Sequence, residues 1–137
     1  MSPASDLSRQ VAAAFVAAIN QRSVDDLLNL MSADHVFIDG LGAHIQGKEA
    51  MRPAWHGYFR MVPDFRVTVE ETYADGPVVV MIGSAGGTCS RAGELDPENC
   101  WSVPAAWRAV VRDGLVAEWR VFADNEPIRR ILARNRS

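Results

Sequence analysis

The sequence predicts an α+β fold, in which helices come first and a mostly antiparallel sheet follows. Apolar residues recur every three or four positions in the first third of the chain, which indicates amphipathic helices. From residue 65 onward they alternate with polar residues, which indicates strands, and Asp-Gly pairs typical of tight turns separate two pairs of these strands. Helices that are segregated from a run of hairpin-connected strands are typical of α+β proteins.

Length and composition are those of one folded domain. The chain has 137 residues, of which 48% are hydrophobic and 23% are charged, so we expect a single domain over residues 1–137. The net charge of -3 disfavours a nucleic-acid binder that is held by phosphate contacts. No apolar run is long enough for a membrane helix, and the first ten residues lack a secretory signal pattern. We therefore expect a cytoplasmic protein with reduced cysteines at Cys89 and Cys100.

Three helices are predicted in the first half of the chain. Ser5 is expected to cap the first helix, and Ser23 a short second helix that buries residues up to Met31. A third helix is predicted for residues 48–62, with Pro53 kinking or delaying its start. The apolar stripe of the first helix is formed by Leu7, Val11, Phe15, Ala18 and Ile19.

One predicted strand precedes the third helix. Residues 35–39 alternate, so that His35, Phe37 and Asp39 share one face and the two residues between them share the other. Four more strands follow, from residue 65 to the Asp75-Gly76 turn, over 78–88, over about 101–111, and over 115–122 after the Asp113-Gly114 turn. A last helix is expected after Asp124 or Asn125, with Pro127 in its first turn.

Five short segments carry a resemblance to a known family. They are FVAAIN at residues 15–20, SVDDLL at 23–28, MSADHVFIDG at 31–40, GKEAM at 47–51 and DGLVAEWRVF at 113–122. In this order they resemble the nuclear-transport-factor-2-like superfamily, and within it the SnoaL-like and ketosteroid-isomerase-like proteins. The resemblance implies a strongly curved, cone-shaped sheet wrapped around the N-terminal helices, with an apolar pocket at its open end. It also implies a homodimer that forms through the outer faces of the sheets.

Asp39 is the candidate catalytic residue. It lies at a strand end, and it matches the position of the general base in ketosteroid isomerases. A carboxylate beside apolar side chains can carry a proton, because burial favours its protonated form. The alternative is a structural carboxylate that accepts hydrogen bonds from the backbone of the turn at residues 40–42. The residues leave both roles open.

The residue sets of the known activities are incomplete in this chain. Ketosteroid isomerases use a Tyr and a protonated Asp as oxyanion donors, and the resemblance places Phe15 and Ala106 at those positions. It places Val121 where SnoaL cyclases and limonene-type epoxide hydrolases carry an Asp, and residues 83–85 where the hydrolases carry Arg-x-Asp. Arg108 is a candidate for binding an anionic substrate, although a solvated arginine is the favoured interpretation.

Two functions from different classes therefore remain open. The first is a cofactor-free, isomerase- or cyclase-like enzyme, in which Asp39 transfers a proton on an apolar carbonyl-bearing or cyclic small molecule. The second is a non-catalytic protein that binds an apolar ligand or partner. No metal site is expected, since no two of the three histidines are three or four residues apart. The residues expected in the pocket are Phe15, Phe37, Trp55, His56, Phe59, Trp119 and Val121.

Overall fold

The computed structural model describes residues 2–136 and confirms the α+β fold. The helices are α1 (Pro3–Asn20), α2 (Val24–Asn29), α3 (Met51–Met61) and α4 (Glu126–Asn135), with a 3-10 helix, η1, at Pro97–Asn99. The strands are β1 (Met31–Ile38), β2 (His44–Gln46), β3 (Arg66–Asp75), β4 (Val78–Thr88), β5 (Cys100–Arg112) and β6 (Leu115–Ala123).

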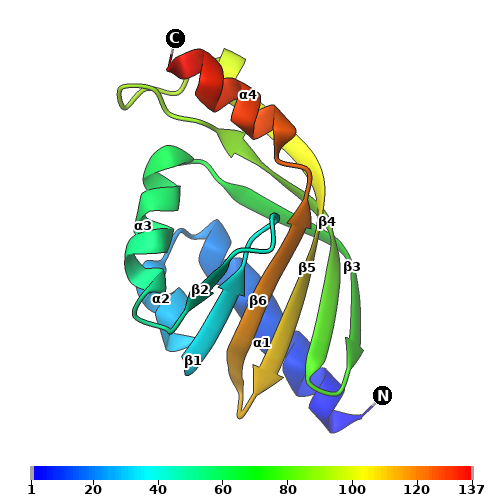
Figure 1. Cartoon of the computed structure of the whole chain (residues 1–137). Helices are drawn as coiled ribbons and strands as arrows, with labels where there is room; N and C mark the ends of the chain where they lie inside the picture. The colour runs from blue at the N-terminus through cyan, green and yellow to red at the C-terminus, as the bar shows by residue number, and fades with distance from the viewer. Residues whose placement is uncertain (1, 137) are drawn as a thin grey trace.

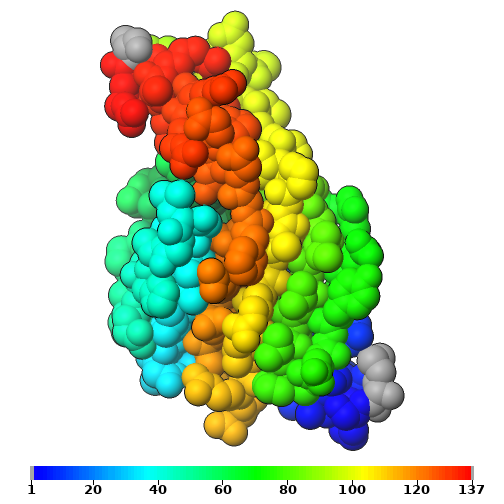
Figure 2. Space-filling view, turned by 45° about the vertical axis from the view of Figure 1, so that its right-hand side comes forward, coloured from blue at the N-terminus to red at the C-terminus, as the bar shows by residue number. Residues whose placement is uncertain are grey.

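The six strands form one open, curved sheet in the order β2-β1-β6-β5-β4-β3. Neighbouring strands are antiparallel except β1 and β6, which are parallel. Helices α1 and α3 lie against one side of the sheet, and α4 lies at one end of it (Figure 1). Strands β1, β6, β5 and β4 lie side by side across the surface in Figure 2, with α4 above them. The core therefore lies between the helices and the inner face of the sheet.

Helix α1 begins earlier than the sequence predicted. Its cap is Ser2, whose hydroxyl accepts a hydrogen bond from the backbone N–H of Ser5 at 3.1 Å. Ser5 is instead buried within the first turn, where its hydroxyl accepts a hydrogen bond from the backbone N–H of Gly76 at 2.9 Å. The predicted cap was wrong because Ser5 contacts the β3–β4 turn, which is far away in the sequence.

Strand β1 also begins earlier than predicted, at Met31. The helical spacing had assigned Met31 to the second helix, but it pairs with Val116 of β6. The register shifts between Met31 and Val36, so an irregularity interrupts the start of the strand. Strand β2 was not predicted, because its three residues are too few to show a periodicity.

The later elements follow the predicted pattern closely. Strand β4 has the predicted bounds, and both Asp-Gly pairs form hairpin turns between antiparallel strands. At the second turn, Asp113 and Gly114 have φ angles of 54° and 74°, the left-handed conformation that two-residue hairpins favour. Helix α3 starts at Met51, with Pro53 in its first turn, which agrees with the predicted delay.

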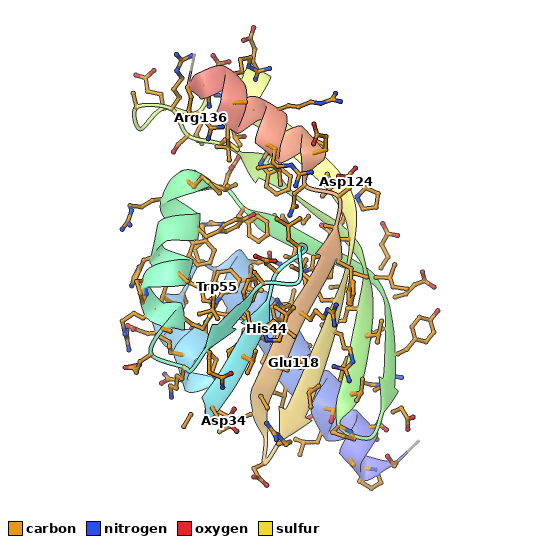
Figure 3. All side chains as sticks on the ribbon, in the orientation of Figure 1. Asp34, His44, Trp55, Glu118, Asp124 and Arg136 are labelled. Atoms are coloured by element: carbon orange, nitrogen blue, oxygen red, sulfur yellow. The ribbon has the colours of Figure 1, made fainter. Side chains whose placement is uncertain are left out.

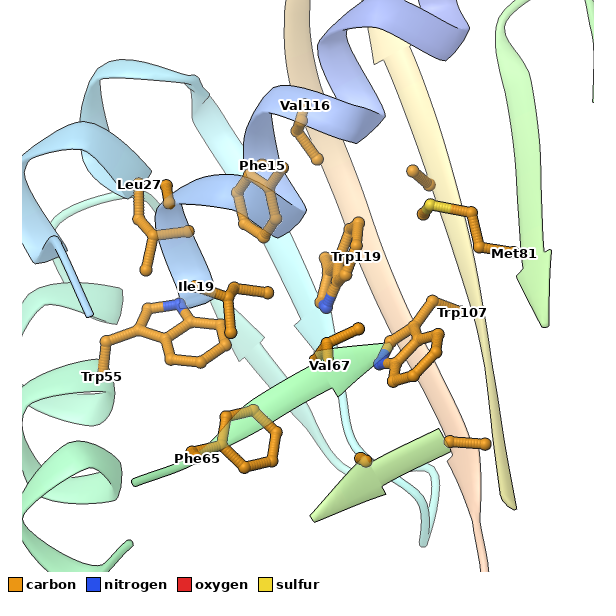
Figure 4. Packing of buried hydrophobic residues seen from close by; sticks show 14 of the residues in the cluster. Phe15, Ile19, Leu27, Trp55, Phe65, Val67, Met81, Trp107, Val116 and Trp119 are labelled. Atoms are coloured by element: carbon orange, nitrogen blue, oxygen red, sulfur yellow. The ribbon is translucent and has the colours of Figure 1, made fainter. Parts of the chain in front are cut away.

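The core is tightly filled where α1 crosses the sheet. Phe15 is completely buried, and its ring centroid lies 4.5 Å from that of Trp119 and 6.2 Å from that of His35 (Figure 4). The Nδ1 atom of His35 lies 2.7 Å from the carbonyl oxygen of Val116. Since a carbonyl only accepts, Nδ1 carries the hydrogen, and Nε2 is left as a buried acceptor without a partner.

Two further observations concern the predicted compartment. None of the helices in residues 2–136 is long and apolar enough to cross a membrane. Cys89 is buried and Cys100 is exposed, and no disulfide joins them. The cytoplasmic location stays a prediction.

Candidate functional site

An apolar cavity of about 320 Å³ lies between the sheet, α3 and α4. Its volume is at the lower end of the range of about 300–1,000 Å³ that is typical of small-molecule sites. Trp55 extends into this region from α3 (Figure 3). The aromatic side chains that line the cavity are Phe37, Trp55, Tyr58, Phe65, Trp101, Trp107 and Trp119.

Large aromatic side chains that alternate along the strands form a wall of the cavity, and small side chains in the lining leave its volume open. Trp101 and Trp107 of β5 and Trp119 of β6 are buried on the inner face, while the residues next to them in sequence are more exposed. The lining also contains small side chains, which do not fill the volume between the large rings. These small residues are Ala54, Ala85 and Ala123.

Asp39 lines the cavity and also holds the turn after β1. Its Oδ1 atom accepts hydrogen bonds from the backbone N–H groups of Leu41 at 2.8 Å and Ala43 at 3.0 Å. The structural role that the sequence left open is therefore present. Within the described chain, Oδ2 has no hydrogen-bond partner, and no other carboxylate lines the cavity. The hydrogen bonds to Oδ1 therefore fix the orientation of the carboxylate.

The turn after β1 packs against the connection between β6 and α4. A Cβ atom on Gly40 would lie 3.1 Å from the side-chain nitrogen of Asn125, so glycine allows this close approach. Asn125 and Ile128 line the cavity from this side. The Asp124 carboxylate does not line it, but accepts a hydrogen bond from the backbone N–H of Glu126 at 3.0 Å, at the start of α4 (Figure 3).

Helix α4 is fastened at its far end to the loop before β5. Arg134 donates hydrogen bonds to the carbonyl oxygen of Glu98 at 2.7 Å and to the side-chain oxygen of Asn99 at 2.9 Å. Ile128 and Ile131 bury the apolar face of the helix. Helix α4 therefore closes one side of the cavity.

The tryptophans bring N–H groups into a mostly apolar site. The indole nitrogens of Trp55 and Trp101 are buried without a hydrogen-bond partner. Those of Trp107 and Trp119 also make no hydrogen bond to any residue between 2 and 136. A buried donor without a partner costs about 1–3 kcal/mol. These groups are therefore the main unused hydrogen-bonding capacity of the site.

Trp101 lies close to the sulfur of Cys89, although its N–H is outside hydrogen-bond geometry. Burial raises the pKa of the Cys89 thiol, and the neighbouring indole N–H lowers it by a smaller amount. The thiol is thus kept in its neutral form. Near this thiol, burial raises the pKa of the Tyr58 hydroxyl well above its ordinary value, and Cys89 raises it further by a smaller amount.

The predicted pocket residues divide into two groups. Phe15 and Phe59 lie outside the lining, where they support Trp55; the ring centroid of Phe59 is 5.3 Å from that of Trp55. His56 is exposed and lies outside the lining, because the residue after Trp55 on a helix points in a different direction. The predicted residues that do line the cavity are Phe37, Trp55, Trp119 and Val121.

Sequence reasoning did not include several lining residues. Tyr58 lies one helical turn after Trp55, a spacing that places both on one face, and this signal could have identified it. Trp101 and Trp107 share one parity in β5, but alternation alone does not tell which face is buried. Asn125 could not have been found, because only the packing of α4 brings it to the cavity.

The outer face of the sheet holds two other candidates. Arg108 forms an ion pair with Glu118 there and does not reach the cavity, so the anion-binding role is wrong. Ala106 lies opposite Ile82 on one side and Phe122 on the other, both exposed on this face. The resemblance had placed Ala106 at an oxyanion-donor position, but it does not line the cavity.

The histidines form no metal site. Along residues 2–136, no group of three or more His, Cys, Asp or Glu side chains is placed to hold a metal ion. His44 and His56 are exposed, and His35 is buried. Burial lowers the pKa of His35, which keeps its ring neutral.

Comparison with known proteins identifies relatives by family and by fold. Residues 12–119 match the model of the SnoaL-like domain. No curated protein matches the chain.

Solved structures share the fold at low sequence identity. A proposed SnoaL-like polyketide cyclase from Jannaschia sp. CCS1 has a TM-score of 0.84 at 19% identity, covering 97% of this chain and 96% of that chain. An LEH-like epoxide hydrolase from M. tuberculosis has a TM-score of 0.78 at 19% identity, covering 97% and 94%. A hypothetical protein with a ketosteroid isomerase-like fold from Catenulispora acidiphila DSM 44928, in complex with trimethylamine, has a TM-score of 0.75 at 21% identity, covering 86% and 88%.

Proposed function

The chain belongs to the SnoaL-like domain family, and from this premise we propose that its cavity binds a small, apolar, planar molecule. The observation that carries the proposal is the cavity of about 320 Å³, walled by aromatic side chains from the sheet and α3. Flat aromatic walls favour a planar ligand, because stacked and edge-to-face ring contacts add to the burial of apolar surface.

A fluorescence titration tests binding. The probe is 6-propionyl-2-(dimethylamino)naphthalene, a neutral naphthyl ketone whose emission shifts to the blue in apolar surroundings. We expect saturable binding of one probe per chain with a blue shift. Ala123→Phe fills the cavity and is expected to abolish the shift, whereas Ala13→Phe, at an exposed position of α1, is the matched control. Equal binding by both variants would contradict the cavity as the site.

Proton transfer by Asp39 is a second candidate function. Among the described residues, Asp39 has the only carboxylate that lines the cavity, and its Oδ2 atom makes no hydrogen bond. This free oxygen favours the role of a base. The two backbone hydrogen bonds to Oδ1 fix its orientation, which a general base needs. A ligand in the cavity would then meet a base as well as indole N–H groups.

We also propose that two chains pair through the outer face of the sheet. Ile82, Ala106 and Phe122 are neighbours in register across three strands of this face. Ile82 and Phe122 are 39% and 47% exposed, which leaves apolar surface in water.

A further inference from the structure

Two of the four indole N–H groups converge. Trp107 of β5 and Trp119 of β6 point their indole nitrogens toward the same space, beside Val67 (Figure 4). All three residues line the cavity. Trp107 is 3% exposed and Trp119 is 1% exposed, and neither N–H meets an acceptor within residues 2–136.

Strand pairing fixes these two donors. Trp107 lies opposite Val121, and Trp119 lies opposite Ala109, so the tryptophans are diagonal neighbours on adjacent strands. The Phe15 ring, 4.5 Å from Trp119 between centroids, supports that indole from behind. Donors held in this way need little reorganisation when an acceptor arrives between them.

The indole N–H groups of the other two tryptophans, Trp55 and Trp101, lie in different surroundings. The nitrogen of Trp101 lies beside the Cys89 sulfur. That of Trp55 lies on the side of its ring toward Ile19 (Figure 4). Both nitrogens are completely buried, and neither has a hydrogen-bond partner among residues 2–136.

We propose that the N–H groups of Trp107 and Trp119 together bind one oxygen of the ligand, and that this oxygen belongs to a neutral carbonyl group. A carbonyl oxygen has two lone pairs and can accept both hydrogen bonds. The proposal rests on the proposed binding function and names the polar group that the ligand must carry.

The charges of the residues that line the cavity disfavour an anionic ligand. No Lys, Arg or His of the described chain lines the cavity, and its one ionisable carboxylate is Asp39. A carboxylate or phosphate placed here would have no cation and would be repelled by Asp39, which makes its transfer from water costly. A ketone or enone meets both donors without that cost.

Paired probes test the inference. 1-Tetralone and tetralin have the same bicyclic skeleton and differ in the carbonyl group, and isothermal titration gives the ratio of their affinities. Trp107→Phe and Trp119→Phe keep an aromatic ring and remove the N–H. Each is expected to lower the ratio of tetralone to tetralin affinity about 2–10-fold, the net value of one hydrogen bond. Trp101→Phe is the matched control, and it is expected to change both affinities by the same factor.

The wild-type protein gives an independent readout. In ¹⁵N-labelled protein, tetralone is expected to move the indole signals of Trp107 and Trp119 downfield, while tetralin does not. An unchanged affinity ratio in both variants, with these signals unmoved, overturns the donor pair but leaves the proposed binding function in place. Absence of binding by both compounds overturns the proposed function and the donor pair together. Tighter binding of 1-naphthoate than of tetralone overturns the neutral carbonyl class.

Discussion

The inner side of the sheet has a filled end and a hollow end, and strand β6 runs through both. At the filled end, Phe15, His35 and Val116 are completely buried. At the hollow end, Val121 and Ala123 border a cavity of about 320 Å³. One strand therefore supports two environments, and the size of the side chains facing it decides which one forms.

The polar groups differ in the same way. At the filled end, the Nδ1 atom of His35 donates to the Val116 carbonyl, and the Nε2 atom of the same ring has no partner in the described chain. At the hollow end, four indole donors and one oxygen of Asp39 have no partner among the residues described. Unsatisfied polar groups destabilise a fold unless a ligand or water meets them. The filled end thus stabilises the protein, and the hollow end is suited to binding.

The largest expected effect is a loss of stability at the filled end. Phe15→Ala removes a completely buried ring and should lower the free energy of unfolding by about 3–5 kcal/mol. Val121→Ala removes a half-buried side chain that already faces the cavity, and should cost under about 1 kcal/mol. Urea unfolding of both variants measures the contrast. Equal losses would mean that the two ends are packed alike.

The next effect concerns chemistry at the hollow end. If Asp39 is a base, the protein should speed the exchange of the C2 hydrogens of 1-tetralone for deuterium in D₂O. Asp39→Asn keeps an oxygen for the Leu41 and Ala43 N–H groups and removes the base, so exchange should slow about 10²–10⁴-fold. Proton NMR of the ketone follows the reaction.

Asp124→Asn is the control for this measurement, because Asp124 accepts a hydrogen bond from the Glu126 N–H and lies outside the cavity lining. Its exchange rate should match that of the wild type. If the wild-type protein binds tetralone but does not accelerate its hydrogen exchange, the catalytic role of Asp39 is contradicted, while the binding role is not.

A smaller effect is expected on the outer face, where neither end of the core is touched. Phe122→Asp should raise the dissociation constant of the proposed homodimer about tenfold or more, the usual effect of losing an apolar anchor. Light scattering at micromolar concentration measures the mass. Leu95→Asp is the control, since Leu95 is also 47% exposed but lies in the loop between β4 and β5. A monomeric wild type contradicts the dimer.

The smallest effect is a dependence of stability on pH at the filled end. Burial lowers the pKa of His35 below its ordinary 6.5, so the unfolded chain binds a proton more readily than the folded one. The stability is full above about pH 6.5 and is lost as the pH falls toward the lowered pKa. The loss is about 1.4 kcal/mol for each unit by which the pKa is lowered.

Unfolding in urea between pH 5 and pH 7.5 measures this loss. His35→Gln can still donate to Val116 but does not titrate, so its stability should vary less with pH over this range. His56→Gln removes an exposed histidine and should keep the wild-type dependence.

Local patterns determined much of the molecule. Helical spacing, period-two alternation and the two Asp-Gly turns predicted the α+β fold and the order of its main elements. These sequence patterns predict the elements correctly because each pattern depends only on residues that are a few positions apart in the chain. The placement of Asp39 at a strand end, beside a turn that it holds, followed from the same local reasoning.

Which residues come together in the site was decided only by the tertiary structure. Alternation in β5 put Trp101 and Trp107 on one face, but the sequence did not show which face the helices would cover. Ser5 bonds to Gly76, and His35 bonds to Val116, across 71 and 81 positions of the chain. The cavity likewise combines Trp55 of α3 with Trp107, Trp119 and Asn125 from the far end of the sequence. Periodicity is identical for both faces of a strand, and a hollow forms only where distant small and large side chains meet.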